Sequence, residues 1–195
     1  MTDTSVSLLE RLKYAERDGP DWRRMHDIYT PLVRKWIRRA PGLGHEADDL
    51  AQDVLVVVVR EIARFERQRE GSFRAWLRQI TINRCRSHMK RRNRQFGKGA
   101  RLNAAEEFLD QLEDPTGDLA IQWDRQHDEH VFRTLLKLIK ADFTPVTWSA
   151  FRRFALDGEP ASHVAADLKI SENSVFLAKS RVLKRLRTEA AGLID

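Results

Sequence analysis

The sequence predicts an all-α protein made of two small helical domains joined by a flexible acidic linker. Apolar residues recur at the three- and four-residue spacing of amphipathic helices over most of the chain, whereas strand-like alternation and hairpin dipeptides are almost absent. Residues 96–126 are the one long stretch without this spacing, and they separate residues 1–95 from residues 127–195. We therefore expect a helical bundle on each side of a linker.

The first domain is expected to contain four helices, over residues 5–17, 21–40, 46–68 and 72–92. Pro41 and the glycines after it end the second helix, and Ser72 is a suitable N-cap for the fourth. The six apolar residues at 54–59 could alone form a buried strand, but helical spacing continues on both sides of them. We assign them to the central helix of this domain.

The linker is expected where the charge of the chain changes sign. Residues 84–101 contain eight Lys or Arg and no acid, whereas residues 106–129 contain nine acids and a single Lys or Arg. Glycines and a proline interrupt this part of the chain. Residues 96–126 should therefore be irregular, with one short helix near 104–112.

The second domain is expected to contain helices over residues 127–141, 144–157, 160–168 and 172–190. Pro145 and Pro160 stand near helix starts, where a missing N–H costs little, and Gly158 follows a helix end. The last two helices have helix-turn-helix spacing, with small Ala165 and Ala166 where they cross. The polar face of the final helix suits a DNA major groove, and an ordinary helical hairpin with a solvated basic face is the alternative. That face carries Asn173, Ser174, Lys179, Ser180, Arg181 and Lys184.

A second polar and basic face follows the apolar side of the expected helix 72–92. We interpret the aromatic residues Phe73 and Trp76 as core, because they share the spacing of a buried stripe. The opposite side suits phosphates and exposed base edges, with a merely solvated face as the alternative. It carries Asn83, Arg84, Ser87, His88, Arg91 and Arg92.

Four acids, Glu46, Asp48, Asp49 and Asp53, gather at the start of the third expected helix. His45, Asp49 and Asp53 are four residues apart and could share a helix face as metal ligands, but a divalent-ion site takes oxygen ligands from several elements. No second acidic cluster with ligand-like spacing stands out in this half. Favourable helix-end electrostatics is a further explanation for Asp48 and Asp49.

Composition excludes several classes of protein. Thirty-five Lys and Arg against 29 Asp and Glu give a formal net charge of +6, which favours a polyanionic or acidic partner. Cys85, the single cysteine, cannot form an internal disulfide or a multi-thiolate metal site. No segment reaches the roughly 18 apolar residues of a membrane span, and no signal-peptide pattern is present. No hydrolase or kinase motif occurs, so we expect a cytoplasmic non-enzyme without catalytic residues, metal or cofactor.

The chain resembles the extracytoplasmic-function (ECF) group of bacterial sigma-70 factors in stretches that follow the family's order. They are EADDLAQDV, then FERQREGSFRAWLRQITINRCRSHMKRR, the linker, and a helix-turn-helix ending in RVLKRLR. The resemblance implies that residues 1–95 are sigma region 2, which opens and holds the −10 element and docks on the polymerase β′ clamp helices. It implies that residues 127–195 are region 4, which reads the −35 element and contacts the β flap.

The resemblance also implies three sets of site residues. The polymerase-binding set matches the family pattern D-x-x-DL-x-Q-[DE] and contains Asp48, Asp49, Gln52 and Asp53. The −10 set contains Phe65, Asn83, Arg84, His88, Arg91 and Arg92, with Phe65 and the following loop at the place where the family captures a flipped base. The −35 set contains Ser171, Asn173, Ser174, Lys179, Ser180, Arg181 and Lys184. The acidic linker would thread the polymerase near the RNA path.

Four positions depart from the family's usual pattern, so the −35 sequence does not follow from the resemblance. They are Ser87 in place of Asp, His163 in place of Glu, and Phe176 and Ala178 in place of basic residues. The expected helix 144–157 is also rich in aromatics. We interpret Trp148, Phe151 and Phe154 as core, with a regulatory partner surface as the alternative.

The expected partners are core RNA polymerase, promoter DNA and an anti-sigma factor or other regulatory partner. Two other classes of function stay open. One is an autonomous helix-turn-helix regulator that binds duplex DNA without polymerase, as a dimer on paired half-sites. The other is a metal-dependent enzyme acting on nucleic acid.

Overall fold

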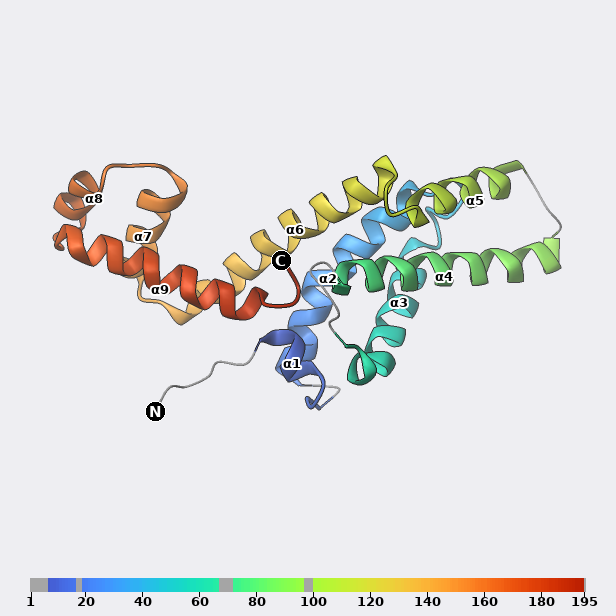
Figure 1. Ribbon diagram of the computed structural model, residues 1–195, viewed down its shortest axis with the longest axis horizontal. Coiled ribbons are helices and arrows are strands. Elements are labelled where there is room, and N and C mark those ends of the chain that lie inside the picture. The colour runs from blue at the N-terminus through green and yellow to red at the C-terminus, as the bar shows by residue number, and fades with distance from the viewer. Residues whose placement is uncertain (1–6, 17–18, 67–71, 97–99, 195) are drawn as a thin grey trace.

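The protein is represented by a computed structural model that describes residues 7–16, 19–66, 72–96 and 100–194. Within these ranges the chain is helical, and its only β pairing is an isolated bridge between Ala191 and Ile194. The all-α prediction is confirmed (Figure 1).

The helices of the first half lie close to their predicted places: α1 (Leu8–Leu12), α2 (Pro20–Arg39), α3 (Ala47–Glu61), the 3-10 turn η1 (Ile62–Arg64) and α4 (Ser72–Phe96). The expected helices 5–17 and 46–68 are shorter than predicted, and residues 5, 6, 17, 67 and 68 lie outside the described part. The run at 54–59 is helical, as predicted, because α3 buries Val54 and Val58 between α2 and α4. Burial offsets the poor helix propensity of valine.

The expected short helix near 104–112 is present within α5 (Ala100–Glu113). The rest of the prediction for residues 96–126, an irregular linker, is wrong for the residues that are described, because α5 is longer than expected and α6 (Asp118–Ile139) begins within this range. Ala105, Leu109 and Leu112 lie on one side of α5 and are buried against α4 and α6. Their spacing of four and three residues is typical of a helix, but the acidic residues between them make this apolar pattern difficult to recognise in the sequence.

The helices of the second half follow the prediction, with one irregularity. They are the 3-10 turn η2 (Lys140–Asp142), α7 (Pro145–Phe151), α8 (Ala161–Leu168) and α9 (Glu172–Ala190). The expected helix 144–157 changes after α7 into a π-helical turn, η3 (Arg152–Leu156), where the Asp157 N–H donates to the Arg152 carbonyl at 2.9 Å. Such turns have i to i+5 hydrogen bonds.

The buried side chains form two cores that share α9. The larger core joins α1 to α6 with Val182 and Leu186 from the second half of α9. The smaller core contains Val164 of α8 and Val175 of α9, surrounded by alanines. Figure 1 shows α9 running from the α7 and α8 end of the molecule back toward α1 and α2. The two predicted domains are therefore packed together.

Helix α6 strengthens this connection, because it runs along α2 of the first half. The Trp36 and Trp123 rings lie 5.2 Å apart, and the Tyr29 hydroxyl lies 3.3 Å from Nε2 of buried His127. Side chains of α6 therefore complete the core of the first half.

Candidate functional site

Helix α3 presents a polar face opposite its buried valines. Asp49, Gln52 and Asp53 are all exposed, and their spacing of three, four and one residues keeps them on one side of the helix. Val56, with 46% of its side chain exposed, continues this face by one turn. The sequence pattern located the three polar residues but gave no reason to expect an exposed valine beside them.

Asp48 differs from the other acids of α3 because it is paired within the molecule. Arg34 and Arg38 of α2 each donate a hydrogen bond to its carboxylate at 3.1 Å. The hydrogen bond from Arg34 is the main cause that lowers the pKa of Asp48 below its usual value, and the positive charge of Arg38 adds to it. No hydrogen bond or ion pair from any described residue reaches Asp49 or Asp53, so their negative charges remain available to a partner.

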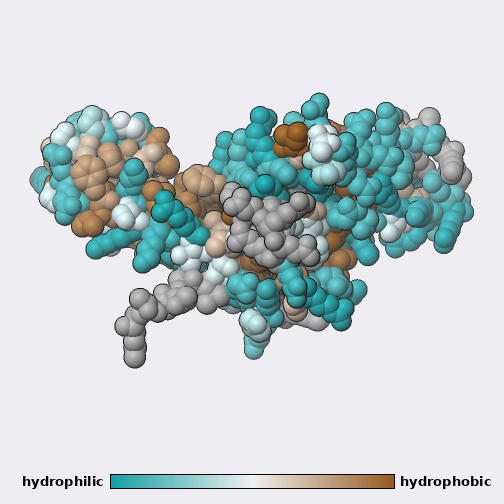
Figure 2. All heavy atoms as spheres, in the orientation of Figure 1, coloured by the Kyte–Doolittle hydropathy of each residue, from teal (hydrophilic) through white to brown (hydrophobic). Residues whose placement is uncertain are grey.

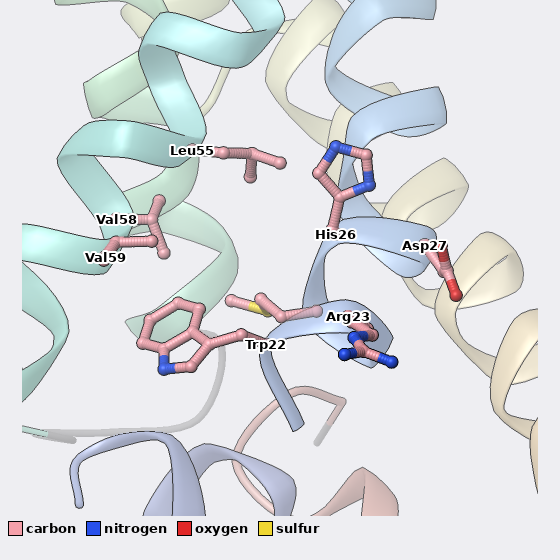
Figure 3. A pocket seen from close by; sticks show the side chains of 8 residues that line it. Trp22, Arg23, His26, Asp27, Leu55, Val58 and Val59 are labelled. Carbon is pink, nitrogen blue, oxygen red and sulfur yellow. The ribbon is translucent and has the colours of Figure 1, made fainter. Parts of the chain in front are cut away.

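An apolar cavity of about 510 Å³ opens between α2 and α3 beside this face. In Figure 3, Trp22 and His26 of α2 face Leu55 and Val58 of α3 across it. Its walls are lined mainly by apolar side chains, together with Arg23, His26 and Asp27 of α2. Among the described residues, no three His, Cys, Asp or Glu are grouped as a metal would require.

Helix α4 carries the expected basic face, but some of its residues are exposed and others are paired with neighbouring elements. Asn83, Arg84 and Arg91 are exposed, and Asn83 accepts a hydrogen bond from the Gln79 amide at 3.3 Å. Arg92 instead donates to the Gly42 carbonyl and to Glu46, both at 3.0 Å.

His88 lies on the same side, with its Nε2 at 3.9 Å from the Glu46 carboxylate. Arg92 therefore ties α4 to the start of α3, and His88 lies beside this contact without a hydrogen bond of its own from Nε2 to a described residue. Of the six predicted −10 residues, Asn83, Arg84 and Arg91 are the most accessible to nucleic acid.

Arg86 is the basic residue of α4 that is most fully neutralised. Its guanidinium donates to Glu106 at 3.0 Å, Asp110 at 2.5 Å and Glu113 at 2.6 Å, all on α5. The acidic segment that follows the basic helix thus folds back and covers part of it. The change from basic to acidic residues along the sequence is the signal for this pairing of α4 with α5, although the same change also suggests a linker.

Phe65, which was predicted to contact a −10 base, is not on the surface. Only 8% of it is exposed, and its ring packs on those of Trp76 at 4.9 Å and Phe73 at 5.6 Å. The predicted direct contact does not fit this arrangement, because a base could stack on Phe65 only after the cluster opened. Residues 67–71 of the expected base-binding loop lie outside the described residues.

Cys85 lies on the inner side of α4. Burial raises the pKa of its thiol to about 12, so the thiol stays protonated at neutral pH and is unsuited to nucleophilic or redox chemistry. It serves as a core residue.

The helices α8 and α9 of the helix-turn-helix agree with their predicted bounds, and Lys169 makes the turn in a left-handed conformation with φ 54°. Of the two alanines predicted where these helices cross, Ala165 is buried and Ala166 is exposed. Ser171 caps α9, since its Oγ accepts a hydrogen bond from the Ser174 N–H at 3.1 Å. The side chains of Asn173 and Ser180 are exposed on the far side from the core. Arg181 and Lys184 are exposed as well, and Lys179 lies over the Phe154 ring at 5.3 Å.

Two apolar side chains also lie on the exposed part of α9, and sequence reasoning missed both as surface residues. Phe176 is 49% exposed and Leu177 is 45% exposed. Of the aromatic residues predicted to be core, Phe151 is fully buried, Trp148 packs against it at 5.5 Å, and Phe154 lies at the edge against Phe176.

Comparison with known proteins places the polar faces of α3 and α4 in one recognised domain. The family "Sigma-70 region 2" matches residues 25–95, from within α2 almost to the end of α4. The chain is also similar to the ECF RNA polymerase sigma factor SigE of Mycolicibacterium smegmatis, with 30% identity over 98 residues. That similarity covers 49% of this chain and 35% of the relative.

None of the described helices has the length and apolar character needed to cross a membrane. The matched region contains the acidic face of α3 and the basic face of α4, and the helix-turn-helix of α8 and α9 follows it in the chain. Together these similarities relate residues 25–95 to sigma-70 region 2 and about half of the chain to part of an extracytoplasmic-function sigma factor.

Proposed function

We propose that this protein is a sigma factor that binds core RNA polymerase and directs transcription initiation at promoters with defined −10 and −35 elements. The observation that carries the proposal is the pair of unpaired carboxylates, Asp49 and Asp53, exposed with Gln52 on α3 of the sigma-70 region 2 match. An acidic face without a described partner, on a mainly basic protein, favours a basic partner surface, and the β′ clamp helices supply one in the family.

The promoter would be contacted by the two basic faces. On α4, the exposed residues Asn83, Arg84 and Arg91 would bind the −10 element, while Arg92 holds α4 against the start of α3. On α9, the polar face that starts at Asn173 would enter the major groove of the −35 element. The α7 to α9 end would contact the β flap.

The protein would act in the cytoplasm, together with the polymerase. It would perform no chemistry of its own, since the polymerase supplies catalysis. An anti-sigma factor or another regulatory partner would control it, as is common in the family.

The test of docking is Asp53→Arg, with Glu129→Arg as a matched control on the exposed side of α6. We expect Asp53→Arg to abolish co-purification with core polymerase, because a positive charge would then face the basic clamp, and we expect the control to be retained. Circular dichroism of both variants checks that the fold is intact. Retention of Asp53→Arg at the wild-type level would refute the docking assignment.

A gel shift with promoter DNA separates this function from that of an autonomous regulator. A sigma factor shifts the DNA strongly only when core polymerase is added, whereas a helix-turn-helix repressor or activator shifts it alone. Isothermal titration with Mg²⁺ and Mn²⁺ addresses the third class, a metal-dependent enzyme, which requires binding that is lost in Asp49→Ala.

A further inference from the structure

The outermost stripe of α9 has an apolar side chain at its centre. Asn173, Leu177, Ser180 and Lys184 follow one another at four, three and four residues, so they share one face of the helix. The opposite face is the buried one and carries Val175, Ala178 and Val182. Leu177 therefore points away from the core, and 45% of it is exposed.

The two exposed apolar residues of α9 are not equivalent. Phe176 lies on the flank of the helix, and its ring meets that of Phe154 edge to face at 5.2 Å. Leu177 borders a hollow of about 250 Å³ between α7 and α9, with Val146 and Ile170 on its other walls. Figure 2 shows apolar side chains gathered at this end of the molecule. Of the two, Leu177 is the one that lies within the outward stripe.

The surroundings of Leu177 favour a polyanionic partner. Residues 173–188 of α9 contain five Lys or Arg and no acid. Three of these cations, Lys179, Arg181 and Lys184, are exposed within two turns of Leu177. Positive charges around an apolar centre fit duplex DNA, where phosphates flank the groove and the base edges lie at its floor.

Only one group on the major-groove edges of the four bases is apolar, and that group is the C5 methyl of thymine. We propose that Leu177 is a specificity residue that reads thymine in the −35 element by packing against this methyl group. The inference rests on the proposed function, since it requires α9 to lie in the major groove. Because α9 is rigid and capped at Ser171, the position of Leu177 is fixed relative to the polar residues on either side of it.

The test uses holoenzyme, formed from core polymerase and the full chain, with a promoter selected from a library randomised over the −35 element. Each thymine there is replaced by uracil, which differs from thymine in the major groove only by lacking the methyl. We expect one or two replacements to weaken wild-type binding about fourfold each, the effect of exposing one methyl group. Leu177→Ala should bind the thymine promoter correspondingly less tightly and be insensitive to uracil at the same positions.

The matched control is Leu156→Ala, because Leu156 is 48% exposed at the same end of the molecule but lies in η3 and not on α9. It should keep both the wild-type affinity and the wild-type response to uracil. The inference is overturned if Leu177→Ala and wild type respond equally to uracil at every position. It is also overturned if Leu177→Ala leaves promoter binding unchanged, which would make this leucine a protein-binding residue.

Failure of the inference and failure of the proposed function give different results. If no holoenzyme forms or no promoter is selected, the proposed function fails. If holoenzyme forms and initiates normally but uracil has no effect that depends on Leu177, only the inference fails.

Discussion

Adjacent residues Asp48 and Asp49 have the same side chain but different electrostatic surroundings. Asp48 turns toward α2, where Arg34 and Arg38 hold its carboxylate and lower its pKa, whereas Asp49 projects outward without a described partner. Because its folded pKa is lowered, the stabilisation from Asp48 is present at neutral pH and is lost as the pH falls through that pKa. The two acids therefore differ in their surroundings, because Asp48 is paired within the fold and Asp49 is exposed.

This difference predicts unequal effects of removing each charge. We expect Asp49→Asn to weaken binding to core polymerase about tenfold, close to the ~1.4 kcal/mol of an exposed charge contact at an interface. Asp48→Asn should weaken it less than about threefold, since its charge is already neutralised by two arginines. Biolayer interferometry at two salt concentrations measures both, and the loss for Asp49→Asn should shrink at high salt. A larger loss for Asp48→Asn would contradict this division of roles.

Single residues also mark the limit of what the sequence could predict. The exposed positions of Asp49, Gln52 and Asp53 followed from helical spacing, because the same spacing buries Leu50, Ala51 and Val54 on the other side of the helix. The burial of Phe65 did not follow, because it depends on Phe73 and Trp76, which reach it from α4 after a separate loop. The exposure of Leu177 did not follow either, since an apolar residue in a helix is ordinarily interpreted as core.

At the scale of helices, α4 and α5 pack together, and the sequence alone did not predict this packing. Nine acids after a basic helix looked like a solvated linker, yet three of them, on successive turns of α5, converge on Arg86. The same turns bury Leu109 and Leu112. The alternation of apolar and polar residues along α5 is a weak signal for a packed helix, because the polar side of α5 faces α4 as well as solvent. The helix-turn-helix was predicted well, since its small residues, cap and turn all lie within one short stretch.

The turn between α8 and α9 contains the one non-glycine residue with positive φ among those described. Lys169 has φ 54° and ψ 44° at the end of α8, a conformation that costs a residue with a Cβ about 1 kcal/mol relative to glycine. We expect Lys169→Gly to raise the free energy of unfolding by up to ~1 kcal/mol, partly offset by the entropy of glycine in the unfolded chain. Thermal denaturation followed by circular dichroism measures the change.

Two further variants test the cause of this effect. Lys169→Ala keeps the Cβ and removes the charge, so its stability should stay near that of the wild type. Lys169→Val should be less stable than both, since branching at Cβ is unfavourable at positive φ. Stabilisation by alanine equal to that by glycine would show that the lysine charge, and not the backbone, is responsible.

At the scale of the whole molecule, the two predicted domains meet at a buried carboxylate. Glu189, near the end of α9, is 1% exposed and is bound by Arg11 of α1 at 3.0 Å, Arg24 of α2 at 3.4 Å and Arg185 of its own helix at 2.5 Å. No sequence pattern predicted this network, because its members lie up to 178 residues apart. One acid thus holds α9 against α1 and α2 at the start of the first half of the protein.

Removing the Glu189 carboxylate should weaken the contact of α9 with α1 and α2 more than it weakens the packing within either half of the protein. Three arginines would lose their shared partner, and breaking such a buried ionic group typically costs about 3 kcal/mol. We therefore expect Glu189→Ala to lower the free energy of unfolding by roughly that amount, whereas Glu129→Ala, an exposed acid on α6, should leave it nearly unchanged. Urea denaturation gives both values.

Hydrogen exchange then locates the change. Amides of α1 and of the last turns of α9 should lose protection in Glu189→Ala, while those of α3 and of the smaller core around Val164 and Val175 should keep it. This pattern follows from the packing, because α9 is shared by both cores and only its second half depends on Glu189. If protection fell equally in all helices, the junction would be part of one cooperative unit, and the two halves of the protein would have to open together.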